Sequence, residues 1–329
     1  MIKSGKSKTI VFIGSGAIAT SLGNILAAKS ENKVVLLSIE HEVVDAINQA
    51  HTNSKYFPNF QLHPELKATG NMEILQEADM IFLAIPSVAI VGYLKSNQTY
   101  ISKKAVLVNL AKGFGNDFQL IPDWVNANMS NVMATMKGPS FARDIINGQP
   151  TGFTIASTDP SCFPVFGEVF SKTIIHLDYS TDVQGVEYAS ILKNIYAIVI
   201  GIVDANFDSP NLRSLILTKA INEMRSLILR FGGKSETMFN YCGFGDFSLT
   251  ALNDLSRNRT LGLLIGKGFF TKDISEKVVL EGRIATNVFY EKLSQTIDVD
   301  AEYRLMSELY GVFNKDCEIK SFVDRILKD

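Results

Sequence analysis

The chain has 329 residues, more than one hydrophobic core normally serves, so we expect two domains. Apolar residues make up 46% and charged residues 20%, as in a globular protein that folds in water. The formal net charge of −2 offers no basic surface to a nucleic-acid backbone, which argues against nucleic acid as a partner. Three scattered cysteines, Cys162, Cys242 and Cys317, fit neither a disulfide framework nor a structural zinc and favour a reducing cytoplasm.

The N-terminus imitates a secretory signal, because lysines precede an apolar run from Ile10 to Ala28. Gly14 and Gly16 interrupt this run, and another strand-like run follows it, so we expect a strand, a turn and a helix instead. The most apolar later stretch, Ile195 to Val203, is shorter than the roughly 20 residues of a transmembrane helix. No membrane insertion is therefore expected.

Short apolar and β-branched runs alternate with helical patterns in the first half of the chain. They predict strands at 9–13, 34–37, 80–85, 106–110, 132–136, 152–156 and 174–177. Such alternation is typical of a mostly parallel sheet covered on both faces. From Thr181 the pattern becomes helical, with long segments at 183–205, 212–231 and 274–293. We expect an α/β domain over 1–181 and an all-helical domain over 182–329.

The first strand ends in Gly14-x-Gly16-x-x-Ala19. Gly14 permits a tight turn, Gly16 lets a pyrophosphate approach the backbone, and the small Ala19 lets helix and strand pack closely. Because the turn begins the first strand-turn-helix unit of an alternating domain, it favours dinucleotide binding over mere tight packing. Glu40 follows the second strand, where it either accepts hydrogen bonds from an adenosine ribose or simply begins an exposed helix.

Lys193 lies in an apolar helical segment from Ile191 to Ile200 that is predicted to be buried on most sides. Burial lowers the pKa of a lysine, and such a lysine can exchange a proton with a substrate hydroxyl. The alternative is a lysine that reaches to the surface. Asn194 adds a second polar group to the same turn and favours a site. All four histidines precede the domain boundary, so the second domain must perform acid-base chemistry without imidazole.

Two loops follow predicted strands, at the sheet edge where open α/β sheets bind ligands. Lys112 belongs to Ala-Lys-Gly after the strand 106–110, and Gly138-Pro-Ser140-Phe-Ala142 follows the strand 132–136. Each alone is better explained as an ordinary loop.

The segment from Gly243 to Arg259 combines a carboxylate, hydroxyls and two guanidiniums beside glycines. Arg257 and Arg259 offer planar forks that match phosphate oxygens, while Asp246, Thr250 and Asn258 can bond substrate hydroxyls. A phosphorylated, hydroxylated small molecule would suit this mixture. A solvated loop that ends in a basic patch is the alternative.

Together these motifs resemble the NAD(P)-dependent glycerol-3-phosphate dehydrogenase family of the bacterial type, over nearly the whole chain. The matching pieces are the Gly-x-Gly turn, 53–58 (Asn-Ser-Lys-Tyr-Phe-Pro), 111–113, 138–142, 185–187, 192–194, 245–250, 256–259 and Glu281-Gly282. The resemblance implies a Rossmann domain followed by an all-helical domain, usually as a homodimer. It also implies the interconversion of glycerol 3-phosphate and dihydroxyacetone phosphate for phospholipid synthesis, without a metal.

The resemblance further implies roles for single residues. Lys193 corresponds to the proton acceptor, with Lys112 and Asp246 completing the polar cluster. Arg257 and Asn258 match phosphate-binding positions, and Gly138, Ser140 and Ser256 match substrate contacts, to which the residue pattern adds Asn194 and Thr250. The nicotinamide cofactor is expected at Gly14, Gly16, Ala17, Ile18, Glu40, Lys112, Ala142, Arg257, Val279 and Glu281.

The chain departs from the family pattern around the cofactor. Ala17-Ile18 replaces a serine and an aromatic residue, Ala19 replaces a third glycine, and no arginine follows the second strand. Glu40, with no arginine or lysine between 34 and 49, predicts a preference for NADH over NADPH, unless Arg259, Lys267 or another distant cation cancels the repulsion. Two rival functions stay open, a related two-domain reductase of hydroxy or keto acids and a non-catalytic nicotinamide-binding sensor.

Overall fold

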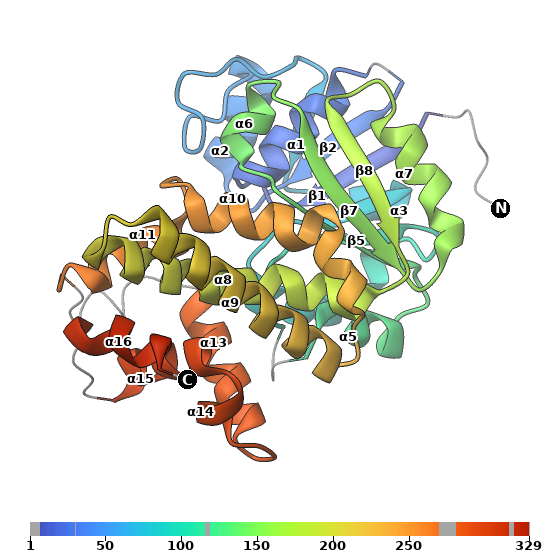
Figure 1. Ribbon diagram of the computed structural model, residues 1–329. Helices are drawn as coiled ribbons and strands as arrows, with labels where there is room; N and C mark the ends of the chain where they lie inside the picture. The colour runs from blue at the N-terminus through green and yellow to red at the C-terminus, as the bar shows by residue number, and fades with distance from the viewer. Residues whose placement is uncertain (1–6, 30, 116–118, 270–280, 316–318, 329) are drawn as a thin grey trace. The chain divides into compact units, whose positions relative to one another are not determined.

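The computed structural model describes residues 7–29, 31–115, 119–269, 281–315 and 319–328. The chain divides into two compact units, Met1–Val183 and Gln184–Asp329, close to the boundary expected at residue 181. Unit 1 is a Rossmann-like α/β domain and unit 2 is helical, with no strand among its described residues (Figure 1). Each unit is described by itself below.

Unit 1 is built on one eight-stranded sheet with the order β3-β2-β1-β4-β5-β6-β7-β8. Neighbouring strands are parallel except β6 and β7. The edge strand β3 has no counterpart among the predicted strands, because its four residues include only two apolar ones and are alternately buried. The strands are β1 (Thr9–Ile13), β2 (Lys33–Leu37), β3 (Leu66–Thr69), β4 (Met80–Leu83), β5 (Val106–Asn109), β6 (Met133–Lys137), β7 (Thr151–Ser157) and β8 (Ile175–Ser180).

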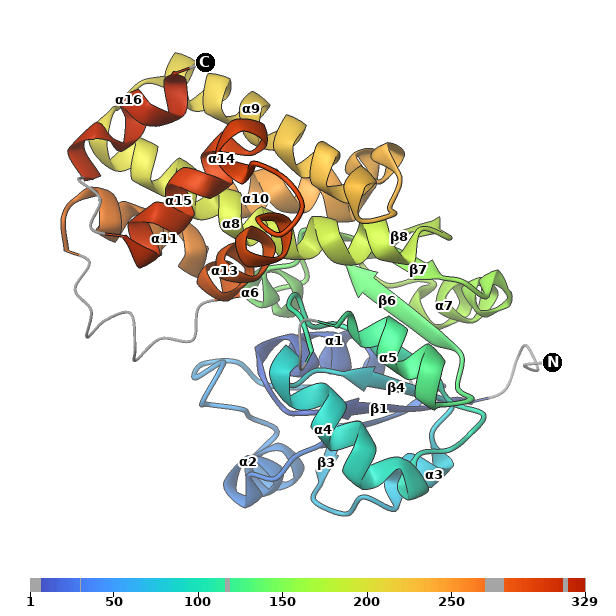
Figure 2. The same ribbon diagram turned by 90° about the horizontal axis from the view of Figure 1, so that it is seen from below.

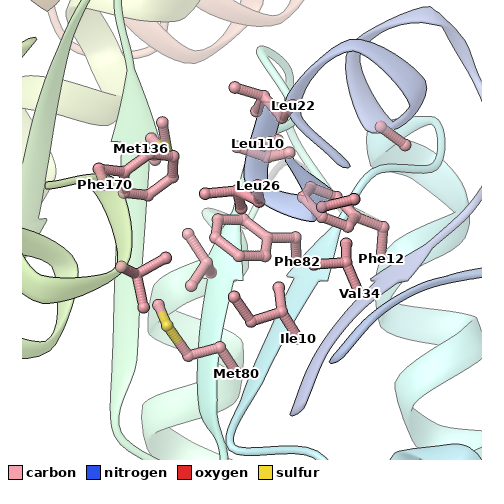
Figure 3. Close-up of a cluster of buried hydrophobic side chains, with 14 of the residues drawn as sticks. Ile10, Phe12, Leu22, Leu26, Val34, Met80, Phe82, Leu110, Met136 and Phe170 are labelled. Carbon is pink, nitrogen blue, oxygen red and sulfur yellow. The ribbon is translucent and has the colours of Figure 1, made fainter. Parts of the chain in front are cut away.

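Helices cover both faces of this sheet, as the continuous apolar strands require. Successive residues of β1 point to opposite faces: Ile10 and Phe12 belong to one buried cluster, Val11 and Ile13 to the other. The first cluster includes α1 (Ala17–Ala27), α6 (Ala142–Ile146) and α7 (Phe163–Phe170). The second includes α3 (Ile74–Glu77), α4 (Ser87–Asn97) and α5 (Ile121–Asn128). Figure 3 shows the first cluster, in which the rings of Phe12 and Phe82 stack with centroids 4.6 Å apart.

Unit 2 is organised around α8 (Val183–Asn206), which the other helices surround (Figure 2). They are α9 (Pro210–Arg230), α10 (Asp246–Leu252), α11 (Arg257–Gly266), α13 (Glu281–Leu293), α14 (Val299–Glu302), α15 (Arg304–Asn314) and α16 (Phe322–Leu327). The predicted helices at 183–205 and 212–231 thus correspond to α8 and α9. Of the helix expected at 274–293, residues 274–280 lie outside the described part of the chain.

The most apolar stretch of the sequence, Ile195 to Val203, is only part of α8. By length and composition α8 could cross a membrane, but the qualifying window is wholly buried inside the protein. This is the behaviour of a core helix, in which polar residues such as Glu187, Ser190 and Lys193 are covered by protein instead of lipid. Their presence also explains why the apolar run looks short in the sequence.

Two glycines let α8 and α11 touch backbone to backbone. A Cβ on Gly201 would come within 2.3 Å of the Arg259 carbonyl oxygen, and one on Gly262 within 2.1 Å of the Ile198 carbonyl oxygen. Any larger side chain would force the two helices apart. The crossing therefore fixes where α11 begins relative to the segment of α8 that carries Lys193.

Unit 2 also holds a partly buried carboxyl group that the sequence did not single out. Glu223 of α9 accepts hydrogen bonds from the backbone N–H of Leu305 at 2.8 Å, from Met306 at 3.3 Å and from the Tyr196 hydroxyl at 3.0 Å. It therefore caps the first turn of α15. Burial is the largest influence and raises its pKa from 4.5 to about 7, although the three hydrogen bonds act in the opposite direction.

We expect Glu223 to make the stability of the protein depend on pH. Because the folded-state pKa is raised, the folded protein holds the proton more tightly, and this contribution is lost as pH rises from 4.5 to about 7. The loss has an upper limit of about 3 kcal/mol. Urea unfolding of the wild type and Glu223→Gln at several pH values measures it. The free energy of unfolding should fall more steeply with pH in the wild type, whereas parallel curves would contradict this role.

Candidate active site

The glycine turn of unit 1 has the geometry that a dinucleotide requires. Gly14 has φ +108°, and a Cβ there would lie 2.8 Å from the Ala84 carbonyl oxygen, so only glycine fits. Gly16 precedes α1, no side chain caps that helix, and a Cβ on Gly16 would meet no described atom within 4 Å. The first N–H groups of α1 therefore have no side-chain cap, and the absence of a side chain at Gly16 lets a pyrophosphate approach this end of the helix. Ala19 is fully buried against the sheet, as expected of the third small residue.

Side-chain hydrogen bonds join this turn to the two segments that follow β2. The hydroxyls of Ser15 and Ser38 lie 2.7 Å apart. Asn53 donates to the Ser15 carbonyl at 3.0 Å and to the Thr20 hydroxyl at 2.9 Å. A pocket of about 710 Å³ lies beside these contacts, lined by residues 40–43, 46 and 53–55. Glu40 lines it in an ion pair with Lys55, a residue to which the sequence analysis gave no role.

Lys112 and the loop after β6 lie together, as expected from their positions at strand ends. The Lys112 ammonium donates to the Gly138 carbonyl at 3.1 Å and to the Ser140 hydroxyl at 3.3 Å. A Cβ on Gly138 would come within 2.3 Å of the Gly152 carbonyl oxygen, so this glycine allows close packing on β7. Ser140 remains half-buried.

Lys137 is a second lysine at this place that the sequence analysis missed. It is completely buried at the end of β6, and its ammonium donates to the carbonyl oxygens of Asn109, at 3.3 Å, and Ala111. The two lysines therefore bond each other's neighbours. Lys137 donates to Ala111, the residue before Lys112, and Lys112 donates to Gly138, the residue after Lys137. A lysine directly after the apolar run 132–136 and directly before Gly138 was the signal available in the sequence.

In unit 2 the structure brings together three residues predicted from distant segments. The Lys193 ammonium lies 2.6 Å from Oδ1 of Asp246 and 2.8 Å from the Thr250 hydroxyl, which itself donates to the Asp246 carbonyl at 2.7 Å. All three are buried, with exposed fractions of 4%, 1% and 5%. Lys193 is therefore an interior lysine and not one that reaches the surface. Burial opposes its charge, and the adjacent carboxylate favours it.

Asn194 and the start of α11 lie close to Gly282. A Cβ on Gly282 would come within 2.8 Å of both the Asn194 carbonyl oxygen and Oδ1 of Asn258. The Asn194 amide also donates to Glu281 at 3.5 Å. Oδ1 of Asn258 is buried without a hydrogen-bond partner among the described residues, whereas buried acceptors normally have one. Asn258 is thus suited to accept a hydrogen bond from a ligand.

The two arginines of α11 have different surroundings. Arg257, the first residue of the helix, is exposed. Arg259 is 8% exposed and donates to Asp204, to Asp254 at 3.0 Å and to the Ala251 carbonyl at 3.1 Å. The expectation that Arg259 binds phosphate is wrong for this structure, because its guanidinium is occupied within the protein. Ser256 accepts from the Arg259 N–H at 3.3 Å and caps the helix.

Of the remaining residues predicted to bind the cofactor, the structure describes three and leaves out one. Ala17 and Ile18 begin α1 and Ala142 begins α6, each half-buried against the first hydrophobic cluster of unit 1. Val279 lies outside the described residues, as does Cys317. Cys162 and Cys242 are both buried. Within the described ranges no group of three His, Cys, Asp or Glu side chains is arranged to hold a metal ion.

A dinucleotide-binding turn in a Rossmann domain, followed by a helical domain with a buried lysine–carboxylate pair, defines the class of nicotinamide-dependent dehydrogenases. Sequence comparison makes the assignment narrower. The profile of the NAD-dependent glycerol-3-phosphate dehydrogenase N-terminus matches residues 9–163, and that of the C-terminus matches residues 182–324. The chain belongs to the NAD-dependent glycerol-3-phosphate dehydrogenase family.

Individual relatives agree with this assignment over nearly their whole length. A Leptospira biflexa protein named glycerol-3-phosphate dehydrogenase (NAD(P)+) is 32% identical over 326 residues, with 97% of each chain covered. A Geobacter sulfurreducens protein of the same name is 32% identical, with 94% of each chain covered. The crystal structure of glycerol-3-phosphate dehydrogenase from Coxiella burnetii superposes with a TM-score of 0.88 at 27% identity, covering 98% of this chain and 99% of that one.

Proposed function

We propose that the protein interconverts sn-glycerol 3-phosphate and dihydroxyacetone phosphate. The observation that carries this proposal is the buried Lys193–Asp246–Thr250 cluster of unit 2, in a chain whose two units both match the family. When bound, the nicotinamide cofactor donates or accepts the hydride. The open N-terminus of α1 and the pocket beside Glu40 fit its pyrophosphate and adenosine.

Lys193 is proposed to transfer the proton at the substrate's C2 oxygen. During reduction its ammonium gives a proton to the oxygen that becomes the hydroxyl, and during oxidation its amine takes that proton back. Asp246 and Thr250 hold the Lys193 nitrogen in place through bonds of 2.6 and 2.8 Å. A nitrogen fixed in this way loses little entropy when the substrate is positioned. In unit 1 we assign Lys112, which is held by Gly138 and Ser140, to binding the negatively charged substrate.

The substrate phosphate is assigned to the start of α11. Arg257 is exposed there, at the positive end of the helix dipole, and its planar guanidinium can bond two phosphate oxygens at once. Asn258 is adjacent and has a buried acceptor suited to a substrate hydroxyl. Arg259 takes no part, because its partners lie within the protein.

We expect Arg257→Lys to raise the KM for dihydroxyacetone phosphate by roughly tenfold, because an ammonium cannot replace the two-pronged contact. The free energy of unfolding should stay unchanged, since Arg257 is exposed. Arg259→Lys is the matched control: it should destabilise the fold with a smaller effect on KM. Steady-state kinetics and urea unfolding of both variants give the comparison. If Arg257→Lys keeps the wild-type KM, Arg257 is an ordinary surface residue.

A substrate comparison tests the proposed reaction against its rivals. Oxidation of NADH or NADPH is followed with dihydroxyacetone phosphate, with dihydroxyacetone lacking the phosphate, and with pyruvate. The proposal predicts turnover with the phosphorylated ketone only. Turnover with pyruvate instead would favour a keto-acid reductase, and nucleotide binding without any turnover would favour a sensor.

The wider setting is part of the same proposal. Production of glycerol 3-phosphate would supply phospholipid synthesis. Three scattered cysteines, which suggest no disulfide framework, suit the reducing cytoplasm in which phosphorylated metabolites occur. We further propose that the enzyme acts as a homodimer, as the family resemblance implies.

A further inference from the structure

The ion pair of Glu40 and Lys55 stands where a Rossmann domain recognises the adenosine ribose. Glu40 lies three residues after β2, the position from which an acidic side chain reaches the ribose hydroxyls. Lys55 comes from a different segment, after α2 (His41–Asp45) and the π-helical residues Ala46–Ala50 that continue it, and donates to Oε2 of Glu40. The sequence window 34–49 contains no lysine or arginine, but the folded chain supplies a lysine from outside it.

Both segments are attached to the turn that binds the pyrophosphate. The Glu40 backbone N–H donates to the Ser38 hydroxyl at 3.1 Å, and that hydroxyl contacts Ser15 at 2.7 Å. Asn53, two residues before Lys55, is 1% exposed and donates to the Ser15 carbonyl at 3.0 Å. Glu40 and Lys55 are therefore held at a set place relative to Gly14 and Gly16. Their position beside the pocket of residues 40–43, 46 and 53–55 belongs to the fold and not to a loose surface loop.

The ion pair of Glu40 and Lys55 can separate at a small cost in free energy. The side chain of Lys55 is 54% exposed and that of Glu40 is 37% exposed. Water screens such a pair, and exposed ion pairs contribute little to stability. A ligand with a greater negative charge than one carboxylate, such as a phosphate monoester, can therefore draw Lys55 away from Glu40.

We propose that Glu40 and Lys55 together determine which nicotinamide cofactor is accepted, with Lys55 binding the 2′-phosphate of NADP(H) and Glu40 binding the ribose hydroxyls of NAD(H). Lys55 stays paired with Glu40 when the ribose is unmodified and turns to the phosphate when it is present. The NADH preference expected from Glu40 alone is thus reduced, to less than about tenfold. This inference rests on the proposed use of a nicotinamide cofactor and adds the residue that sets its selectivity.

Binding of nucleotide fragments tests the proposal without any turnover. Isothermal titration of the full-length protein compares adenosine 2′,5′-bisphosphate with adenosine 5′-monophosphate. Lys55→Gln should lower the affinity for the bisphosphate by about tenfold, because one charge-assisted hydrogen bond is lost, and should leave the affinity for the monophosphate unchanged. Glu40→Gln should raise the affinity for the bisphosphate, because this substitution removes a carboxylate that repels the 2′-phosphate.

Lys33→Gln is the matched control. Lys33 begins β2, at the opposite end from Glu40, and makes an ion pair of similar exposure with Glu77 at 2.7 Å. It should alter neither affinity. In the wild type, the ratio of the bisphosphate affinity to the monophosphate affinity should fall as salt is added, an observation that needs no variant.

Three results would overturn the proposal: equal weakening of both nucleotides by Lys55→Gln, no weakening of the bisphosphate, or the same selective loss in Lys33→Gln. The ratio of kcat/KM for NADPH to that for NADH should follow the binding data. A protein that shows the predicted nucleotide selectivity but does not reduce dihydroxyacetone phosphate would refute the proposed reaction and leave this inference standing.

Discussion

Replacing Lys193 with alanine is expected to lower kcat by about 10²–10⁴-fold, the contribution of a positioned general acid-base group. Binding of the reduced cofactor, followed by its fluorescence, should remain, because the cofactor residues of the glycine turn belong to unit 1. The variant should also be less stable. Asp246 is 1% exposed, and without Lys193 its carboxylate loses its charged partner in the interior.

A second variant separates the chemical effect from the structural one. Lys193→Met with Asp246→Asn removes both charges, so no unpaired buried carboxylate remains, and the free energy of unfolding should recover towards the wild type. Turnover should stay as low as in Lys193→Ala. If turnover returned together with stability, Lys193 would be a structural residue and the proposed proton transfer would be wrong.

Asp204 is expected to be one of the most important side chains for the stability of unit 2. Its carboxylate is 3% exposed and accepts from Arg213 of α9 at 2.6 Å and from Arg259 of α11, so it joins both helices to α8. Asp204→Ala leaves the buried guanidinium of Arg259 without this partner and should cost about 3–5 kcal/mol of unfolding free energy.

Asp254→Ala provides the comparison, because Asp254 bonds the same arginine at 3.0 Å but is 82% exposed. Its loss should cost no more than about 1 kcal/mol. Urea unfolding of the two variants under the same conditions gives both values. Equal losses would show that burial of Asp204 does not determine the strength of the pair.

The periodic parts of the fold could be predicted because pattern and environment agree in them. The first strand, the turn at Gly14 and the helix that follows all appear at their expected places, since each needs only local sequence and a buried face. β3 could not be predicted: it is an edge strand of four residues, stabilised by its pairing with β2. In contrast, α8 was predicted at 183–205, within one residue of its observed bounds, although buried polar side chains interrupt its apolar pattern.

The site was predictable as a set of residues but not as a set of contacts. Arg257 and Arg259 are two residues apart on a helix and so lie on different faces, which means that both could not face one phosphate. Which of them points inward depends on Asp204, 55 residues away in sequence. Lys55 escaped notice for the same reason, since its proximity to Glu40 exists only after residues 38 and 53 have bonded to Ser15.

The central claim is a hydride transfer between the nicotinamide and C2 of a three-carbon phosphate, and isotope transfer tests it directly. Purified protein is incubated with dihydroxyacetone phosphate and reduced cofactor deuterated at C4, in separate reactions for the two faces of the ring. The product is examined by mass spectrometry and NMR. We predict glycerol 3-phosphate with one deuterium at C2 from one of the two labelled cofactors and none from the other. Absence of this product, or product without deuterium from either cofactor, would contradict the account.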